Sequence, residues 1–281
     1  MKFSVQTAVL PELSREQVVA ALSRHGYDAV EWRLHEAYHV DPATLPGSAK
    51  ALGALCADHG LAISCLMGYA PLEDLDQQKR VAEACAIVGC PRYRPGAVIY
   101  DGTHAYPDLF AETVDRLGRV IDVAAPFGVK PVIETHFNTI APSASLAHRL
   151  VSNFPPGRIG VNFDPANCII EGREAWQMGL ELLGPYLDYV HAKNASWVRE
   201  DGRWRWIFDD LANGQVDWRD VMGALRRVGF DGCLSNENFF EVPMKTRGFV
   251  GEDLTVHLDR YRDIDERLAR DLAYLKACLA G

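Results

Sequence analysis

One junction repeats along the chain: a helix-like segment ends at a glycine, and a short apolar run follows at once. It occurs at seven glycines, Gly26, Gly60, Gly89, Gly128, Gly157, Gly184 and Gly229. Glycine commonly ends a helix because it adopts the left-handed conformation without a Cβ clash. The runs after it span four to eight residues and are mostly apolar, which is typical of strands buried on both faces of a parallel sheet. Together with an opening strand in residues 2–9, the seven junctions predict eight strands.

The segments between these strands have helical periodicity. Ser14, with Gln17 three residues later, predicts a capped helix start. Further helices are expected over residues 76–88, 107–125, 143–153, 173–183 and 217–228, and the tail over 252–279 is expected to form one long amphipathic helix or two that break near Asp263. Alternating strands and helices favour a parallel α/β fold. The chain of 281 residues offers about 35 residues to each strand-and-helix unit. We therefore predict one domain over residues 1–281, a single (β/α)8 TIM barrel.

Composition narrows the class of protein. Hydrophobic residues make up 48% and charged residues 24% of the chain, which argues against disorder, collagen and coiled coil. The net charge of −9 disfavours binding to nucleic acid or to anionic membranes. Neither a membrane span nor a signal peptide is expected, because the apolar runs are short and the N-terminal segment is interrupted by polar residues. Seven cysteines without CxxC spacing indicate buried thiols in a reducing compartment, and we expect a cytoplasmic protein.

Ionisable side chains stand at the ends of four predicted strands. Glu134, Asp164, His191 and Glu237 each follow a junction glycine by six to eight residues, so a closed barrel would bring them together at its C-terminal mouth. Three crowded carboxylates would repel one another by about 4 kcal/mol per pair at a spacing of about 4 Å. Either they hold protons at raised pKa values, or a divalent cation neutralises them. One such acid alone is more often a helix cap or a salt-bridge partner, but four at equivalent positions favour a shared metal or catalytic site.

The donor set indicates the kind of ion. Three carboxylates and one imidazole form a hard, mostly oxygen site, which suits Mn²⁺ or Mg²⁺, and Co²⁺ and Zn²⁺ are also compatible. We expect one divalent ion and favour Mn²⁺.

Six segments carry a resemblance to a known family: GYDAVEW, GVKPVIETHF, VNFDPAN, YVHAKN, GQVDW and GFDGCLSNENF. Through them the chain resembles the xylose-isomerase-like TIM barrels, in particular the sugar-phosphate isomerase and epimerase group, which includes ketose 3-epimerases, hydroxypyruvate isomerase and inosose dehydratase. The matching segments span nearly the full length. The resemblance implies one divalent metal held by Glu134, Asp164, His191 and Glu237. It also implies that Glu134 and Glu237 serve as acid and base.

The resemblance leads to an expected reaction. Isomerising or epimerising a ketose removes a proton from a carbon next to a carbonyl, and a cation that chelates the substrate oxygens stabilises the enediolate. Two carboxylates on opposite sides of the sugar can then exchange protons with it. We expect an isomerase or epimerase of a small sugar, keto-sugar or sugar acid. The alternatives are a metal-dependent dehydratase of the inosose dehydratase type and a barrel that binds a sugar without turnover. Glycine-rich nucleotide loops and a serine-nucleophile motif are missing from the sequence, which argues against hydride transfer from a nicotinamide.

Two positions depart from the family pattern. Asn167 stands where ketose 3-epimerases, inosose dehydratases and related abasic-site endonucleases usually have a histidine, three residues after the aspartate. An amide can hydrogen-bond a sugar hydroxyl but is a poor metal ligand, which weakens the interpretation as a multi-zinc endonuclease. Asn194 replaces the aspartate of the family's His-x-Lys-Asp motif.

Several further residues are candidates for contacting substrate, and each has a structural alternative. His136 shares the strand face of Glu134 and either contacts substrate, orients a ligand or forms a hydrogen bond in the barrel top. Lys193 either binds a substrate anion or forms a salt bridge with a carboxylate. Glu31 and Arg94 end the second and fourth strands and either touch substrate or form ion pairs at the strand ends.

A hairpin is predicted after the seventh strand. Asp201 and Gly202 lie between two alternating runs, which is typical of a type I′ turn. By position this hairpin belongs above the mouth of the barrel. Its tryptophans, Trp197, Trp204 and Trp206, would either stack on a sugar or form a subunit interface of a homo-oligomer. The expected partner is thus a small-molecule carbohydrate, with neither nucleic acid nor membrane bound.

Overall fold

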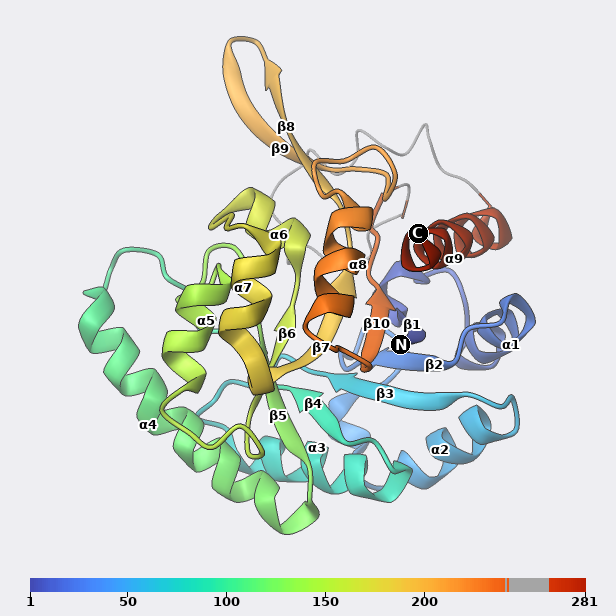
Figure 1. Cartoon of the computed structure of the whole chain (residues 1–281). Coiled ribbons are helices and arrows are strands. Elements are labelled where there is room, and N and C mark those ends of the chain that lie inside the picture. Colours follow the sequence, from blue (N-terminus) through green and yellow to red (C-terminus); the bar gives the residue numbers. More distant parts are fainter. Residues whose placement is uncertain (241, 243–262) are drawn as a thin grey trace.

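The chain folds into a closed barrel of parallel strands (Figure 1). A computed structural model describes residues 1–240, 242 and 263–281. The barrel strands, in the order in which they pair around the ring, are β1 (Lys2–Gln6), β10 (Cys233–Asn236), β7 (Leu187–Ala192), β6 (Gly160–Phe163), β5 (Lys130–Glu134), β4 (Arg92–Arg94), β3 (Ala62–Met67) and β2 (Ala29–Arg33). Their number, their parallel pairing and the closure of the sheet confirm the predicted TIM barrel.

Helices cover the outside of the barrel (Figure 1). They are α1 (Arg15–His25), α2 (Ala49–Ala57), α3 (Leu75–Val88), α4 (Tyr106–Ala124), α5 (Ala144–Val151), α6 (Pro165–Ile170), α7 (Trp176–Leu183), α8 (Trp218–Arg227) and α9 (Ile264–Ala280). Short 3-10 helices are η1 (Thr7–Val9), η2 (Pro42–Thr44), η3 (Ala125–Phe127) and η4 (Gly184–Tyr186). The predicted capping box is present, because the Ser14 side chain accepts from the Gln17 backbone and the Gln17 side chain accepts from the Ser14 backbone.

Two helices, α2 and α6, lie outside the predicted ranges. The short helix α6 begins directly after Asp164, whose side chain caps it, so this single residue connects the end of β6 to the start of the helix. In the predicted tail, α9 begins after Asp263, which is its N-cap. The part of that tail over residues 252–262 falls outside the described residues.

The junction glycines adopt the left-handed conformation at five of seven positions. Their φ values lie between 67° and 79° at Gly26, Gly60, Gly89, Gly128 and Gly229. The prediction is wrong at Gly157 and holds only in part at Gly184, which ends α7 with a positive φ but not in the left-handed helical conformation. Gly184 has φ 49° and ψ −122°, because the 3-10 helix η4 begins there. Gly157 has no positive φ; α5 already ends at Val151, and Pro155 and Pro156 lead into a turn closed by the hydrogen bond from Arg158 N to Pro155 O.

The hairpin after β7 is confirmed. Strands β8 (Ala195–Glu200) and β9 (Arg203–Phe208) pair antiparallel, with Glu200 opposite Arg203. Asp201 and Gly202 between them have φ values of 49° and 77°, and positive φ at both central residues defines a type I′ turn. The hairpin projects beyond the end of the barrel where the strands finish (Figure 1).

The core has two parts. A large apolar layer lies between the strands and the surrounding helices, and a small separate cluster lies inside the ring, formed by Cys65, Val132, Tyr189 and Cys233. All seven cysteines are buried and free, as predicted. Among the described residues, no helix is both long enough and apolar enough to cross a membrane.

Candidate active site

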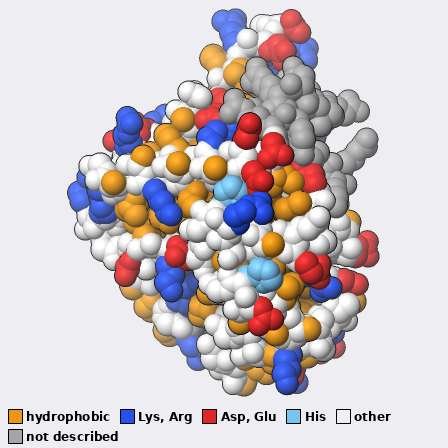
Figure 2. Space-filling model, turned by 90° about the vertical axis from the view of Figure 1, so that its right-hand side faces the viewer, with side chains coloured by type: hydrophobic (Ala, Val, Ile, Leu, Met, Phe, Trp, Pro, Cys, Tyr) orange, Lys and Arg blue, Asp and Glu red, His pale blue; other side chains and the backbone are white. Residues whose placement is uncertain are grey.

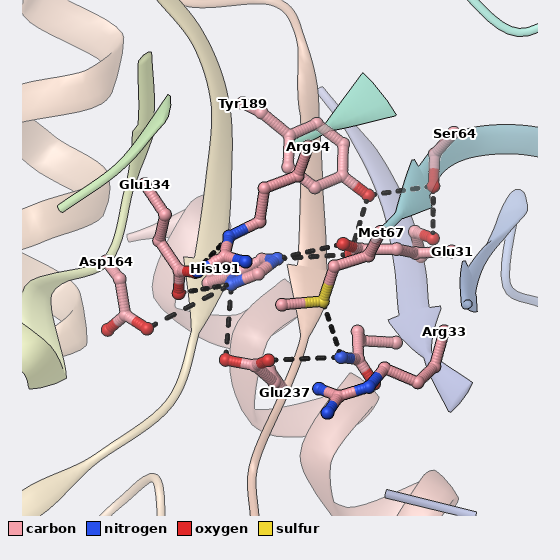
Figure 3. A network of polar contacts seen from close by, with 12 residues as sticks. Glu31, Arg33, Ser64, Met67, Arg94, Glu134, Asp164, Tyr189, His191 and Glu237 are labelled. Atoms are coloured by element: carbon pink, nitrogen blue, oxygen red, sulfur yellow. Dashed lines mark hydrogen bonds and ion pairs between the residues drawn. The ribbon is translucent and has the colours of Figure 1, made fainter. Parts of the chain in front are cut away.

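Four side chains converge at the C-terminal mouth of the barrel (Figure 3). Glu134 is the last residue of β5, Asp164 follows β6, His191 lies in β7 and Glu237 follows β10. One ligand atom from each lies within 4.8 Å of the others, and all four side chains are buried. The Nδ1 atom of His191 is 3.2 Å from Oε1 of Glu134, 3.2 Å from Oε2 of Glu237 and 4.0 Å from Oδ2 of Asp164. The predicted cluster therefore exists as one compact group of donors.

Glu31 holds the ring of His191 at Nε2, the ring nitrogen that does not face the carboxylate cluster. Its Nε2 lies 3.1 Å from Oε1 of Glu31, and Oε2 of Glu31 accepts a hydrogen bond of 3.1 Å from the hydroxyl of Tyr189. Ser64 Oγ lies 2.8 Å from that hydroxyl and 2.7 Å from Ser4 Oγ. This chain of hydrogen bonds runs up the inside of the barrel. It fixes the imidazole so that Nδ1 faces the three carboxylates.

Asn167 supports two of the acids. Its backbone N–H donates to Oδ1 of Asp164 over 3.0 Å, as the N-cap geometry of α6 requires. Its Nδ2 donates to Oδ2 of Asp164 over 2.9 Å and to Oε1 of Glu134 over 3.2 Å. The amide therefore aligns the two carboxylates. Its Oδ1 is buried and has no hydrogen-bond partner in the described part of the chain.

Two cations neutralise part of the charge. Nε of Arg94, the last residue of β4, is 2.6 Å from Oε2 of Glu134. Nζ of Lys193 is 2.8 Å from Oδ2 of Asp164 and 3.1 Å from Oε2 of Glu237, and its side chain is fully buried. Both residues thus form the ion pairs that we gave as the alternative to substrate binding. A contact with substrate stays a prediction for each.

The electrostatics follow from burial and close charges. Burial disfavours ionised Glu134, but Arg94 and His191 outweigh it and hold its pKa well below the usual value. Burial is likewise outweighed at Glu237, where Lys193 and His191 lower the pKa to about 2. At Asp164 burial prevails and, with the charges of Glu134 and Glu237, raises the pKa to about 6 despite Lys193. The pKa of His191 is raised against burial by Glu237 and Glu31. The Asp164 carboxyl is therefore harder to ionise than the carboxyls of Glu134 and Glu237.

These observations fit a divalent cation. The donors are three carboxylates and the Nδ1 atom of an imidazole, gathered within 4.8 Å, which is a set that hard divalent ions prefer. The Glu31 contact leaves Nδ1 of His191 to face the carboxylates, in the arrangement that metal-bound histidines commonly have. The raised pKa of Asp164 is the effect expected of crowded acids without sufficient positive charge.

A cleft of about 680 Å³ opens beside the cluster. It reaches Arg94, which contacts Glu134, and Arg33 and His136 also line it. His136 stacks on the ring of Phe137 and its Nδ1 lies 2.8 Å from the Phe137 carbonyl. Burial lowers the pKa of His136 to about 4, so the ring is neutral at pH 7. Its position at the cleft agrees with a contact to substrate, which stays a prediction.

Trp197 contacts helix α6 rather than the cleft. Its Nε1 donates to the carbonyl of Ile169 in α6 over 3.0 Å, and Trp197 is not among the described residues that line the cleft. In the same hairpin, Trp206 packs on Phe137 and Phe208, with ring centroids 5.1 and 5.2 Å apart. Trp204 is 65% exposed. The predicted roles of these tryptophans in stacking on sugar or in a subunit interface stay untested expectations.

Sequence reasoning missed three residues around the cluster. Gln6 ends β1 and donates to Oε1 of Glu237 over 3.2 Å, Tyr189 holds Glu31, and Arg33 ends β2 at the cleft. Its position at the end of a strand could have identified Gln6 as a site residue, because Gln6 pairs in register with Glu31 at the same level of the barrel. A polar residue that closes an apolar strand is a candidate for the site at that end.

The fold and the cluster define a class, the β/α barrels with a buried carboxylate and histidine site at the C-terminal mouth. Residues 19–276 match the profile of the family described as xylose isomerase-like TIM barrel. The chain belongs to this family, as the resemblance of its sequence motifs predicts.

Individual relatives are distant. A ketose 3-epimerase of Arthrobacter globiformis is 24% identical over 259 residues, which cover 85% of this chain and 80% of the relative. An inosose dehydratase of Geobacillus kaustophilus is 23% identical over 238 residues, covering 79% and 73%. The solved structure of D-psicose 3-epimerase with D-tagatose from Clostridium cellulolyticum H10 has a TM-score of 0.75 at 16% identity, with 99% of both chains covered. At such identity the structural likeness shows the shared fold.

Proposed function

We propose that this protein is a divalent-metal-dependent isomerase or epimerase that acts on a small sugar, keto-sugar or sugar acid. The observation that carries the proposal is the placement of two glutamates on one histidine. Oε1 of Glu134 and Oε2 of Glu237 both lie 3.2 Å from Nδ1 of His191. The similarity to a ketose 3-epimerase over 85% of the chain supports it.

Glu134, Asp164, His191 and Glu237 would hold the metal, for which Mn²⁺ is the preferred choice and Mg²⁺, Co²⁺ and Zn²⁺ are alternatives. When bound, the ion supplies a Lewis acid that stabilises negative charge on the carbonyl oxygen of the substrate. Glu31 and Asn167 would keep His191, Glu134 and Asp164 in the orientation that this role needs.

The two glutamates would move the proton. Both are ionised at neutral pH, since their pKa values are lowered by the neighbouring cations. Arg94 holds Oε2 of Glu134 and Gln6 holds Oε1 of Glu237, so each carboxylate keeps one oxygen towards the centre. In the barrel, β5 and β10 are separated by β6 and β7. A substrate carbon seated between the glutamates would therefore have one base on each side, which is the arrangement that epimerisation requires.

Exchange of substrate hydrogen with solvent tests this proposal. Candidate ketoses and keto-acids are incubated in deuterated water with protein stripped of metal and reloaded with Mn²⁺, and deuterium uptake is followed by mass spectrometry. Glu134→Gln and Glu237→Gln should each slow turnover by about a hundredfold to ten-thousandfold. Glu181→Gln, on the exposed surface of α7, is the matched control and should leave the rate unchanged. Near-native turnover in both active-site variants would contradict the proposal.

A dehydratase is the second candidate function, and the inosose dehydratase relative favours it. The same glutamates would take the proton, and a hydroxyl on the neighbouring carbon would then leave as water. The product distinguishes the two reactions: a dehydratase lowers the mass of a polyol ketone by one water, whereas an isomerase or epimerase leaves the mass unchanged. A bound sugar and retained metal without any deuterium uptake would instead indicate a barrel that only binds sugars.

A further inference from the structure

Within the part of the chain that the structure describes, Arg33 differs from the other arginines of the cleft in forming no direct ion pair with an acid. Arg94 pairs with Glu134, and Arg116 pairs with Glu73 over 2.5 Å. Among the described residues, Arg33 makes no salt bridge. The acids that line the cleft are already engaged, because Glu73 holds Arg116 and Asp101 accepts from the backbone and hydroxyl of Thr103.

The Arg33 side chain is also buried. The residue is 5% exposed, and its Nε has no hydrogen-bond partner within residues 1–240, 242 and 263–281. The guanidinium donates to the hydroxyl of Tyr69 and lies 3.7 Å from the centroid of the Tyr69 ring and 5.3 Å from that of Tyr38. Glu237 and Glu134 act on this guanidinium through their charge, but no carboxylate of the described residues forms a direct ion pair with it. Burying a cation without a direct ion pair is costly, so this guanidinium at a cleft indicates that an anion arrives from outside.

Arg33 lies at the end of the barrel that holds the proposed catalytic glutamates. It is the last residue of β2 and lines the cleft, as does Arg94 at the end of β4. Figure 3 shows the guanidinium on the side of the cluster where Glu237 lies. Arg94 is occupied by Glu134, so Arg33 is the guanidinium that remains to meet a ligand. A molecule whose reacting carbon sits between Glu134 and Glu237 could extend one end to Arg33.

We propose that the substrate of this protein carries an anionic group, a carboxylate or a phosphate, and that Arg33 binds it. The planar guanidinium matches such a group through two parallel N–H donors. Tyr69 and His35 line the same cleft and add polar groups beside it. The inference rests on the proposed function and narrows the substrate from sugars in general to sugar acids or sugar phosphates.

Binding is tested first, without the reaction. Metal-free protein is titrated calorimetrically with inorganic phosphate and with an unreactive aldonate, which carries a carboxylate but no carbonyl. We expect at least one of the two anions to bind the native protein. Arg33→Met should weaken that binding by about tenfold or more, and Arg33→Lys should restore part of it because the charge is kept. Arg119→Met, an exposed arginine on α4, should bind like the native protein. If neither anion binds, or if Arg33→Met binds as tightly as the native protein, the proposal is wrong.

Turnover then separates the sources of the anion. Neutral ketoses, keto-acids and ketose phosphates are compared by deuterium uptake with the Mn²⁺-loaded protein. An anionic class should exchange with a kcat/KM about a hundredfold above that of the neutral class, and Arg33→Met should raise the KM of the anionic class more than that of the neutral ketoses. Exchange into keto-acids would identify the anionic group as a carboxylate, and exchange into ketose phosphates would identify it as a phosphate. Equal exchange into neutral and anionic compounds would overturn the inference and leave the proposed function standing. Arg33-dependent anion binding without exchange into any compound would support the inference and contradict the proposed function.

Circular dichroism of Arg33→Met serves as the check on folding. The spectrum should match that of the native protein, since Arg33 forms no hydrogen bond or ion pair with the four proposed metal ligands in the described structure. If Arg33→Met is misfolded, Arg33→Lys takes its place, and unchanged anion affinity in that folded variant then overturns the proposal.

Discussion

Glu31 and His191 form a buried pair, with Oε1 of Glu31 3.1 Å from Nε2 of the imidazole and neither side chain more than 1% exposed. The contact fixes one ring nitrogen and thereby decides what the other one faces. Nδ1 is left among three carboxylates. Glu31 is therefore a positioning residue for the proposed metal centre.

Glu31→Gln should weaken Mn²⁺ binding by about tenfold to a hundredfold, because the amide no longer fixes His191 as a charged acceptor does. Isothermal titration calorimetry on metal-free protein measures the affinity. Glu36→Gln, a substitution of an exposed glutamate on the loop after β2, is the control and should bind like the native protein. Unchanged affinity in the Glu31 variant would remove the positioning role.

Lys193→Met should destabilise the metal-free protein more than the metal-loaded protein. Lys193 is a buried cation between Asp164 and Glu237, and removing one partner of a buried ion pair typically costs about 3 to 5 kcal/mol. A bound divalent ion would supply positive charge to the same carboxylates and offset part of that loss. Urea unfolding with a chelator and with excess Mn²⁺ measures both values.

Lys79→Met provides the comparison for that experiment, since Lys79 is an exposed lysine on α3. It should change the free energy of unfolding little in either condition. An equal loss for Lys193→Met with and without Mn²⁺ would indicate that Lys193 and the metal do not share ligands.

Metal affinity should rise as pH increases through about 6. Burial, together with Glu134 and Glu237, raises the pKa of Asp164 to about 6, and below that pH its proton competes with the metal. His191, whose pKa is also raised, must likewise lose a proton from Nδ1 to become a ligand. Each such proton weakens binding by about tenfold per pH unit below its pKa.

Calorimetry near pH 5.5 and near pH 7.5, in buffers of different ionisation enthalpy, yields the affinity and the number of protons released. We expect a higher affinity near pH 7.5 than near pH 5.5, and we expect protons to be released when the metal binds. Binding that stays constant, or that strengthens in acid, would show that the metal does not meet these two groups.

Asn194→Asp should destabilise the fold by about 3 kcal/mol. The amide Nδ2 of Asn194 donates to the carbonyls of Leu211 and Val216, over 2.9 and 3.0 Å, and Oδ1 accepts from two backbone N–H groups. A carboxylate has no hydrogen to donate and would place charge against two carbonyl oxygens. Urea unfolding measures the change. A neutral effect would mean that the loop rearranges around the new side chain.

The sequence alone was sufficient to predict the barrel and to place the site at the C-terminal ends of its strands. Helix-ending glycines and buried apolar strands are local features, and each one is encoded in fewer than about ten neighbouring residues. Once eight such units close, the residue at the end of each strand must face the common mouth. For that reason Glu134, Asp164, His191 and Glu237 could be assigned to one cluster before any coordinates were considered. Local reasoning was wrong at Gly157, where two prolines, rather than the glycine, shape the turn after α5.

The pairing of charges was decided only by the tertiary structure. Strand-end position made Glu31, Arg94 and Lys193 equal candidates for contacting substrate or forming an ion pair, and Arg33 was missed. The fold turned Glu31 towards His191 and Lys193 into the carboxylates, and it left Arg33 without a direct ion pair among the described residues. Such choices depend on differences of about an ångström between atoms that are far apart in the chain. Spacing along the sequence fixes the strand and face of a side chain, whereas its partner is set by barrel closure and by the rotamers that packing allows.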